Sequence, residues 1–256
     1  LDLNLTGKIA RAAGDIQNIP IYEIGPGPGG LTRGLLANNA QSVTVVEKDV
    51  RCLAALEQIS QAYPGRLSII SDDALNIDEA ALFPNAKVKV VANLPYNVGT
   101  ALLIKWLTNS QWLPWFDSLT LMFQKEVAER IVASPGSKNY GRLSILSQWR
   151  STAKKLFDLP PKAFTPPPKV TSSVVQITPV PAETKISVKT LEKVTSAAFG
   201  QRRKMLRASL KPMIPNVEDV LNQAQIDPKS RAEMLHVRDF IRLCEVLELK
   251  SSATNE

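Results

Sequence analysis

The sequence of 256 residues is poor in the residues that build disulfide frameworks and metal sites. Its two cysteines, Cys52 and Cys244, lie far apart in the chain, which argues against a disulfide framework and a cysteine-based zinc site. We interpret both as reduced core residues because apolar helical patterns surround them. The only histidine, His236, has no second ligand near it in sequence, so we interpret it as structural and expect no bound metal.

Long apolar runs are also missing. No segment approaches the length of a membrane span and no secretory signal is recognisable, so we expect a cytoplasmic protein without membrane contact. There is no internal repeat and no low-complexity tract. Charged residues make up 21% and hydrophobic residues 44% of the chain, which is typical of a globular protein with a sizeable core. The length fits one large domain or two unequal ones.

Positive charge is present but unevenly distributed. The formal net charge is +7, yet residues 1–137 carry 11 basic and 13 acidic side chains. Residues 138–169 carry seven basic and one acidic, and residues 182–256 carry 13 basic and 10 acidic. A localised basic surface is typical of proteins that bind a polyphosphate, because neutralised phosphates release counterions. A solvated basic face without a partner is the alternative, and charge alone does not choose between them.

Apolar strands alternate with helical patterns through the first half of the chain. Such alternation indicates an α/β fold with a buried parallel sheet of the doubly wound, Rossmann-like type. The predicted strands are 20–24, 42–47, 67–71, 88–92 and 118–123. The predicted helices are 3–13, 31–37, 50–62, 101–107, 125–132 and 142–149.

The second half predicts a different organisation. Two further strands, 154–157 and 173–177, flank a proline-rich loop at 159–170, whose prolines exclude it from a central ladder. Two prolines within 178–184 mark a domain boundary. Beyond it the apolar spacing is helical, so we expect domains at 1–181 and 182–256, the second small and helical. Its predicted helices are 188–199, 202–210, 217–223 and 237–247.

A glycine-rich turn follows the first predicted strand. Gly25, Gly27 and Gly30 match the G-x-G-x-x-G pattern between a strand and a helix, where ligands of α/β sheets bind. Glu47 ends the next strand, where a carboxylate can accept hydrogen bonds from ribose hydroxyls, and Asp73 follows the third, where one can accept from an adenine amino group. This pattern fits a nicotinamide dinucleotide about as well as S-adenosylmethionine. A tight glycine turn without a ligand is the third interpretation.

The segment Asn93-Leu94-Pro95-Tyr96 follows the fourth predicted strand at the same sheet edge. The lone pair of an adenine N6 is delocalised into the ring, so an enzyme assists methylation by accepting both N6 protons in hydrogen bonds. The Asn93 side-chain oxygen and the Leu94 carbonyl can supply these acceptors. Pro95 fixes the turn and Tyr96 can stack on the base. A base presented in this way is first unstacked. A strand-terminating turn is the simpler alternative.

Several motifs of this sequence resemble the ribosomal RNA adenine dimethyltransferase family, over nearly the whole chain. The most specific are N-L-P-Y-N and F-T-P-P-P-K-V-x-S. The matching segments are 23–32 (EIGPGPGGLT), 45–49 (VVEKD), 73–75 (DAL), 93–97 (NLPYN), 124–130 (QKEVAER), 140–144 (YGRLS), 164–172 (FTPPPKVTS), 199–207 (FGQRRKMLR) and 231–235 (RAEML).

The resemblance implies a class I methyltransferase that uses S-adenosylmethionine to dimethylate two adjacent adenines near the 3′ end of small-subunit ribosomal RNA. The expected partner is that RNA within the small subunit, with a role in subunit biogenesis, and a monomeric enzyme. The implied cofactor residues are Gly25, Gly27, Glu47, Asp73 and Asn93. The implied residues around the target base are Asn93, Leu94, Pro95, Tyr96 and Phe164.

Two details of the resemblance bear on activity. Leu94 stands where DNA methyltransferases of similar chemistry often have proline, and leucine there is associated with room for a second methyl group. The family also has a short segment of the type Gln-Asn-Phe-Leu before its first helix, which contributes to the cofactor pocket. This sequence begins at Leu1-Asp2, after or within that segment.

Basic residues gather in two groups that we expect to face RNA, because cations beside an aromatic platform are typical of single-strand binding. Arg203 and Arg207 are predicted to share one helical face. Pairing with Glu192 or Glu218 is the alternative for any single cation. The first group, around Phe164, is Lys138, Arg142, Lys154, Lys155, Lys162 and Lys169. The second is Arg202, Arg203, Lys204, Arg207 and Lys211.

Two other classes of protein stay open. A nicotinamide-dependent oxidoreductase would explain the glycine turn and Glu47 but neither the 93–96 segment nor the basic second half. An RNA-binding assembly protein without catalysis would explain the charge, but the intact Asn93-Leu94-Pro95-Tyr96 segment argues against a complete loss of activity.

Overall fold

The computed structural model describes residues 3–84, 87–109, 112–164, 166–182, 184 and 186–253. The chain divides into two compact units. Unit 1 comprises Leu1–Trp106, Leu113–Ala128 and Thr152–Pro179; unit 2 comprises Leu107–Trp112, Glu129–Ser151 and Val180–Glu256. Residues 107–112 and 129–151 thus group with the C-terminal part. The assignment of separate roles to 1–181 and 182–256 stays a prediction.

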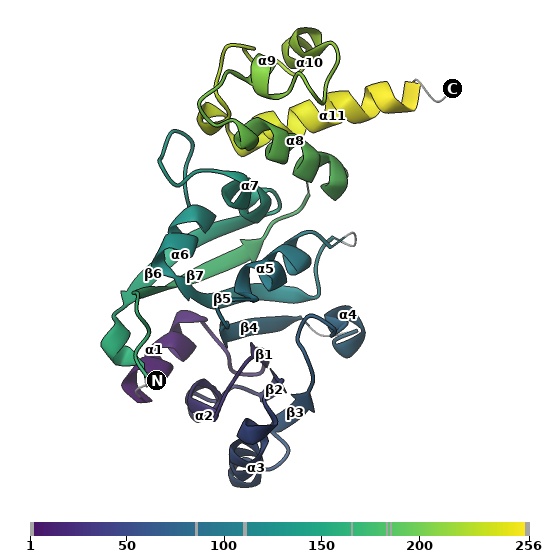
Figure 1. Ribbon diagram of the computed structural model, residues 1–256. Coiled ribbons are helices and arrows are strands. Elements are labelled where there is room, and N and C mark those ends of the chain that lie inside the picture. Colours follow the sequence, from purple (N-terminus) through teal and green to yellow (C-terminus); the bar gives the residue numbers. More distant parts are fainter. Residues whose placement is uncertain are drawn as a thin grey trace. The chain divides into compact units, whose positions relative to one another are not determined.

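Unit 1 is built on a seven-stranded sheet in the order β3-β2-β1-β4-β5-β7-β6 (Figure 1). The first five strands are parallel and β7 runs antiparallel to β5. This is the predicted Rossmann-like sheet, with the topological switch between β1 and β4. The strands are β1 (Pro20–Ile24), β2 (Ser42–Glu47), β3 (Leu67–Ser71), β4 (Val88–Asn93), β5 (Phe116–Gln124), β6 (Ser151–Leu159) and β7 (Ser172–Pro179).

The helices of the first half lie between these strands in the chain. The predicted helix 50–62 begins with a separate 3₁₀ turn because the Asp49 carboxylate accepts a hydrogen bond from the Arg51 N–H at 3.0 Å. The short helix α4 was not predicted, since one turn carries no periodic pattern. The elements are α1 (Leu3–Ala12), α2 (Gly30–Ala37), η1 (Val50–Cys52), α3 (Leu53–Ala62), α4 (Glu79–Leu82), α5 (Gly99–Leu107), α6 (Lys125–Ile131) and η2 (Pro161–Ala163).

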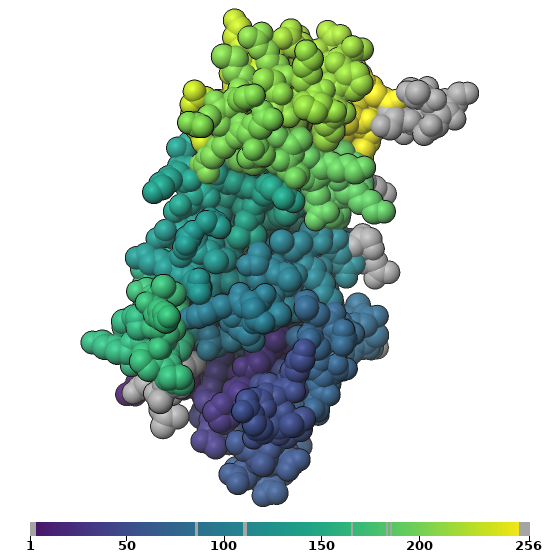
Figure 2. All heavy atoms as spheres, viewed as in Figure 1, coloured from purple at the N-terminus to yellow at the C-terminus, as the bar shows by residue number. Residues whose placement is uncertain are grey.

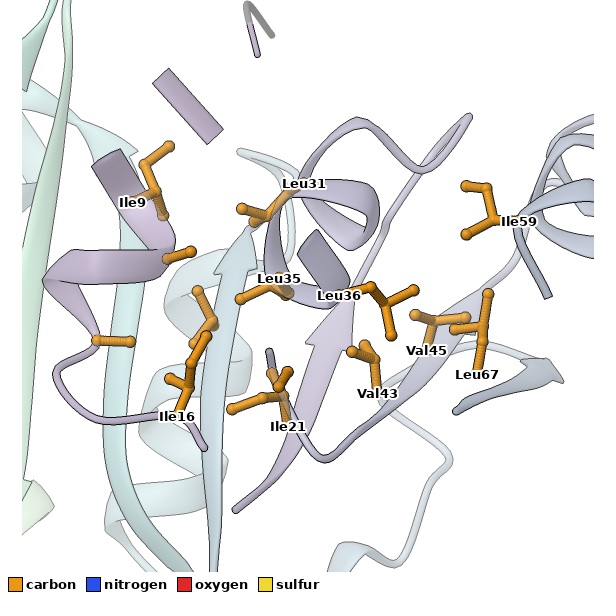
Figure 3. Packing of buried hydrophobic residues seen from close by; sticks show 14 of the residues in the cluster. Ile9, Ile16, Ile21, Leu31, Leu35, Leu36, Val43, Val45, Ile59 and Leu67 are labelled. Carbon is orange, nitrogen blue, oxygen red and sulfur yellow. The ribbon is translucent and has the colours of Figure 1, made fainter. Parts of the chain in front are cut away.

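One face of the sheet packs on α1, α2 and α3. Figure 3 shows Leu31, Leu35 and Leu36 of α2 among side chains from α1 and the strands β1 and β2. Gly34 allows α2 to approach α1 closely, because a Cβ added there would lie 2.7 Å from the Thr6 side chain. Side chains alternate along a strand, so Tyr22 points to the opposite face and packs on Trp115 with ring centroids 5.6 Å apart.

Unit 2 is mainly helical. Its aromatic core stacks Phe199 on Phe240, with ring centroids 5.8 Å apart, and buries Tyr140, whose hydroxyl donates to the Leu235 carbonyl at 2.8 Å. Figure 2 shows α8 to α11 as a continuous surface of green and yellow side chains. The elements are α7 (Arg142–Gln148), α8 (Val188–Gly200), α9 (Leu206–Ser209), α10 (Val217–Gln223), η3 (Ala232–Met234) and α11 (Val237–Ala253).

One predicted helix of unit 2 is wrong. Residues 201–204 form a turn rather than the start of a helix, and α9 spans only Leu206–Ser209. Met205 is extended and pairs with Arg231 in an isolated antiparallel bridge, which ends the helical run. The shared helical face of Arg203 and Arg207 therefore does not exist.

Candidate methyl-transfer site

The glycine turn after β1 contains three left-handed backbone positions in five residues. Gly25, Gly27 and Gly29 have φ of 63°, 55° and 81°, a region that side chains rarely adopt. No atom lies within 4 Å of the position that a Gly27 Cβ would occupy. The turn therefore leaves open space at Gly27, as a loop that passes close to a ligand requires.

Gly29 was missed by the sequence pattern, which pointed to Gly30. A Cβ at Gly29 would lie 2.2 Å from the Ile59 Cδ1 and 3.2 Å from the Leu56 Cδ2, whereas at Gly30 nothing lies within 4 Å. Gly29 is also the residue that precedes α2. Close packing of the turn against α3 thus depends on Gly29. The only sequence signal was the pair Gly29-Gly30, and this pair does not show which of the two glycines must lack a side chain.

Glu47 ends β2 with its carboxylate beside the glycine turn. It accepts a hydrogen bond from the Gly27 N–H at 2.9 Å through Oε2 and one from the Asp49 N–H at 2.8 Å through Oε1. Its side chain is almost fully buried. A carboxylate has about four acceptor positions, so each oxygen keeps one for a ligand such as a ribose diol. Glu47 and the glycine turn are therefore in direct contact, whereas the binding of ribose hydroxyls by Glu47 stays a prediction.

Asp73 lies just after β3, at the same sheet edge. Its carboxylate accepts from the Leu75 N–H at 3.0 Å and pairs with the Lys48 ammonium at 2.7 Å. These contacts hold the pKa of Asp73 below its usual range, the Lys48 hydrogen bond having the largest effect. The Lys48 bond is on the surface and does not block the remaining lone pairs.

Two exposed apolar residues flank these carboxylates. Val50 follows Glu47 by three residues and is 68% exposed, and Leu75 follows Asp73 by two and is 41% exposed. Single exposed apolar residues are common on protein surfaces, so the position of these two beside the carboxylates, rather than their exposure, makes them candidates for a ligand contact. Sequence reasoning missed both residues, although their spacing from Glu47 and Asp73 was the signal that could have found them.

Glu23 is a buried carboxyl one strand away from Glu47. It is 1% exposed and its Oε2 accepts a hydrogen bond from the Thr32 hydroxyl at 2.7 Å. Burial raises the pKa of Glu23 to about 8, the Thr32 hydrogen bond lowers it in part, and the charge of Glu47 raises it further. In the sequence, Glu23 drew attention only as the first residue of the 23–32 motif, so its raised pKa was not predicted.

The Asn93-Leu94-Pro95-Tyr96 segment leaves β4 and turns into α5. The Pro95 carbonyl accepts from the N–H groups of Val98 and Gly99 at 3.1 and 2.9 Å, which starts the helix. Leu94 is buried against Gly99, where an added Cβ would lie 3.2 Å from the Leu94 Cβ. Across the part of the chain that the structure describes, the half-buried Asn93 side chain forms no hydrogen bond. Its amide is therefore free to bind a ligand.

The glycine turn and the 93–96 segment touch each other. A Cβ at Gly25 would lie 3.3 Å from both the Cδ and the Cγ of Pro95. β1 and β4 are neighbours in the sheet, so the ends of these two strands bring together segments that are nearly 70 residues apart in sequence. The predicted meeting of the two motifs at one sheet edge is thus seen as direct packing.

Tyr96 and Phe164 differ in their surroundings. The Tyr96 ring is 43% exposed, and its hydroxyl lies 2.9 Å from the Ser172 hydroxyl. Phe164 follows η2 in the proline-rich loop, is half-buried, and packs against the core cluster beneath α1 and α2. Tyr96 offers an open ring beside Asn93, whereas part of the Phe164 ring is occupied by the core. Its role as a stacking partner stays a prediction.

The predicted RNA-facing cations of unit 1 are exposed, but one of them is paired. Lys155 lies 3.1 Å from the Asp158 carboxylate, which also pairs with Lys125 at 2.9 Å. These cations and the Ser173 hydroxyl lower the pKa of Asp158 to about 2, the Lys125 bond having the largest effect. Part of the charge of Lys155 is therefore neutralised locally. Four cations of the first predicted RNA-facing group lie in this unit and are exposed: Lys154, Lys155, Lys162 and Lys169.

The basic residues of unit 2 divide into paired and open side chains. Arg202 pairs with Glu233 at 2.7 Å and donates to the Ser137 carbonyl at 3.2 Å, and Arg207 pairs with Glu218 at 3.3 Å. The alternative of local ion pairs thus holds for these two. Among the predicted RNA-facing cations of this unit, Arg202 is half-buried and the exposed ones are Lys138, Arg142, Arg203, Lys204, Arg207 and Lys211.

The remaining sequence predictions concern metal ligands, membrane spans, the cysteines and the histidine. Residues 3–84, 87–109, 112–164, 166–182, 184 and 186–253 contain no group of three potential metal ligands, and no helix within them is long and apolar enough to cross a membrane. Both cysteines are free thiols, Cys244 buried and Cys52 only half-buried. The His236 backbone N–H donates to the Asp239 carboxylate at 2.8 Å, and a structural role for its side chain stays a prediction. Leu1 and Asp2 lie outside the described residues.

Solved structures resemble this fold. A dimethyladenosine transferase from Plasmodium falciparum superimposes with a TM-score of 0.83 and 26% identity, covering 98% of this chain and 97% of that one. The 23S rRNA methyltransferase ErmE superimposes with a TM-score of 0.72 and 24% identity, covering 97% and 98%. The first shows a related protein and the second a shared fold.

Sequence comparisons identify the family. A protein of Allorhizobium ampelinum, named Ribosomal RNA small subunit methyltransferase A, is 59% identical over 247 residues, which are 96% of this chain and 89% of that protein. A protein of the same name from Ruegeria is 59% identical over 250 residues, 97% and 89% of the two chains. The family model described as Ribosomal RNA adenine dimethylase matches residues 2–249. The chain is therefore a methyltransferase that belongs to the ribosomal RNA adenine dimethylase family.

Proposed function

We propose that this enzyme transfers methyl groups from S-adenosylmethionine to the N6 atoms of two adjacent adenines near the 3′ end of small-subunit ribosomal RNA. The observation that supports the proposal is the contact between the Gly25 turn and Pro95, because Pro95 belongs to the same segment as Asn93, the proposed amide acceptor. We also propose that it acts in the cytoplasm during small-subunit biogenesis, because that is where bacterial ribosomal RNA, the substrate named for its relatives, is assembled.

The residues around the glycine turn fit S-adenosylmethionine. Glu47 keeps acceptor positions for the two ribose hydroxyls, and Asp73 keeps lone pairs for the adenine amino group. Val50 and Leu75 supply exposed apolar surface for the faces of the adenine ring. Gly27 leaves room for the ligand to pass close to the backbone, and Gly25 lets the turn pack on Pro95. When bound, S-adenosylmethionine supplies an electrophilic methyl group.

The 93–96 segment prepares the amine. The free Asn93 side-chain oxygen and the Leu94 carbonyl accept the two N6 protons, which draws the nitrogen lone pair out of conjugation with the ring. Bound S-adenosylmethionine would supply the methyl group to N6 and keep the bonding electrons on its sulfur, and the displaced N6 proton would pass to water. The chain contributes orientation and hydrogen-bond acceptors rather than a general base.

The aromatic residues hold the base in place. The exposed Tyr96 ring stacks on the target adenine, and the free part of the Phe164 ring contacts it from the proline-rich loop. Leu94 is buried with its side chain against Gly99, so it does not occupy the space beside the amine. That space accommodates the first methyl group while the second is added.

The exposed cations bind the RNA backbone. Lys154, Lys155 and Lys169 belong to the unit that carries the site, and the exposed cations of unit 2 contact RNA independently. Arg203 and Lys204 lie in an open turn and have no ion pair among the described residues, so they are the strongest candidates. Arg202 and Arg207 contact RNA only through the donors that their acidic partners leave free.

The test measures transfer of labelled methyl groups onto small ribosomal subunits that lack the modification, with the modified positions mapped. We expect Asn93→Ala to lower the rate by at least about 100-fold, the cost of removing a comparable acceptor or donor at a transition state. Binding of the variant to the subunits should be retained. The matched control is Asn222→Ala, an exposed residue of α10. Wild-type transfer by Asn93→Ala, or methylation outside adjacent adenines, would overturn the proposal.

A further inference from the structure

The hydrogen bond between Tyr96 and Ser172 joins two segments that the sequence keeps 76 residues apart. Ser172 is the first residue of β7 and is fully buried, whereas the Tyr96 ring is 43% exposed. One end of the bond is therefore fixed in the sheet, and the other belongs to a ring that is open to a ligand. Ser172 also closes the motif F-T-P-P-P-K-V-T-S, whose final serine has no role in the proposed function so far.

Residues 171–173 are held from three sides. The Thr171 carbonyl accepts from the Lys125 N–H at 2.9 Å, at the start of α6. The Ser173 hydroxyl donates to the Asp158 carboxylate of β6 at 2.8 Å. Ser172 itself lies opposite Gln124 in the β5–β7 ladder. The Ser172 hydroxyl is thus an immobile point at the edge of the sheet from which the 93–96 segment emerges.

We infer that Ser172 is a positioning residue that fixes the Tyr96 ring for stacking on the target adenine; this rests on the proposed function. A tyrosine ring has two main torsions, and a hydrogen bond from its hydroxyl to a rigid partner restrains both. Without that restraint the exposed ring samples other rotamers, and the base loses a preformed platform. Ser172 does not contact the reacting atoms and acts only through Tyr96.

The inference links the two aromatic residues of the proposed site. Phe164 and Ser172 lie in one motif, and Tyr96 is tied to that motif through Ser172. The motif therefore contributes twice, once through the Phe164 ring in the proline-rich loop and once through Ser172 of β7, which orients Tyr96. If Tyr96 and Phe164 contacted the base independently of each other, the Tyr96 hydroxyl would not be needed. Removing that hydroxyl therefore tests whether Ser172 orients the Tyr96 ring.

The experiment is a double-mutant cycle with Ser172→Ala, Tyr96→Phe and the double variant. Methyl transfer onto unmodified small subunits gives kcat/KM, and titration with S-adenosylhomocysteine gives cofactor affinity. We expect each single variant to lose about 3- to 10-fold in kcat/KM, the range for one hydrogen bond, with unchanged cofactor affinity. The double variant should lose no more than the worse single variant, since both remove one interaction.

The matched control is Ser173→Ala, which removes the neighbouring buried hydroxyl and its bond to Asp158 but leaves Tyr96 anchored. The fold-loss of kcat/KM that Ser173→Ala causes should multiply with the fold-loss that Tyr96→Phe causes, because the two variants remove independent interactions. Tyr96→Phe changes an exposed ring, so it keeps the test valid if Ser172→Ala does not fold. If the loss of kcat/KM in the double variant equalled the product of the losses in Ser172→Ala and Tyr96→Phe, the inference would be overturned. An unchanged kcat/KM in Tyr96→Phe would also overturn it. Absence of methyl transfer in the wild-type protein would instead overturn the proposed function.

Discussion

The buried carboxyl of Glu23 makes the stability of this protein depend on pH in an unusual direction. Its pKa is raised from an ordinary 4.5 to about 8, chiefly by burial. The folded protein therefore holds this proton more tightly than the unfolded chain does. Between these two pKa values the folded state binds more protons, so the contribution of Glu23 to stability is complete below pH 4.5 and is lost as pH rises toward 8.

The size of the effect follows from the pKa difference. One pKa unit corresponds to about 1.4 kcal/mol, so full ionisation of Glu23 lowers the free energy of unfolding by about 5 kcal/mol. About 3 kcal/mol of this change falls between about pH 5 and pH 8, and the decline levels off above that range. Asp49 and Asp158, with pKa values lowered to about 2, stabilise the fold evenly across this window, because their contribution is lost only in acid.

The perturbation is Glu23→Gln, which keeps an oxygen that can accept the hydrogen bond from the Thr32 hydroxyl but cannot ionise. Urea unfolding at about pH 5, 6, 7 and 8 gives the free energy at each value. We expect the wild type to lose about 3 kcal/mol over this range and the variant to lose much less. The control is Glu57→Gln, an exposed carboxylate on α3, which should leave the wild-type slope unchanged. Equal slopes for wild type and Glu23→Gln would refute the reasoning.

Two further predictions concern glycines. Gly34→Ala should lower the free energy of unfolding by about 1–3 kcal/mol, because its Cβ would lie 2.7 Å from the Thr6 side chain. Gly200→Ala, with open space at the end of α8, should leave the free energy of unfolding unchanged or raise it by up to about 1 kcal/mol, and urea unfolding of both variants measures these changes. Gly27→Val should weaken the binding of S-adenosylhomocysteine by at least about 10-fold in a calorimetric titration, since its side chain would enter the open space of the turn with φ at 55°; wild-type affinity would contradict the proposed cofactor position.

The sequence predicted the sheet well because its strands are apolar and bounded by turns. All five parallel strands lie within a few residues of their expected positions, and β6 and β7 extend the shorter predicted cores. The predicted helix at 202–210 failed for the opposite reason. Its basic side chains are compatible with a helix, but the bridge between Met205 and Arg231 is a contact over 26 residues that no local pattern contains.

The sequence predicted which residues belong to the candidate site, but it did not predict the contacts that those residues make. Gly25, Glu47 and Asn93 could be found from spacing, since strand ends meet at one edge of a parallel sheet. The anchoring of Tyr96 by Ser172 could not, because it depends on β7 returning antiparallel beside β5. The raised pKa of Glu23 likewise depends on how deeply the end of β1 is covered, which alternating strand patterns do not specify.

The contact between Gly25 and Pro95 explains why two motifs far apart in sequence act as one site. Methyl transfer requires donor and acceptor to be placed within a fraction of an ångström, and an error of about 1 Å costs about 100-fold in rate. Gly25 and Pro95 follow neighbouring strands and pack directly, with no side chain between them. Any residue larger than glycine at position 25 would place its Cβ 3.3 Å from Pro95, so the turn or Pro95 would have to shift by a few tenths of an ångström. The distance between the two motifs is therefore set by the order of β1 and β4 in the sheet, and this order rather than either motif alone makes the site competent.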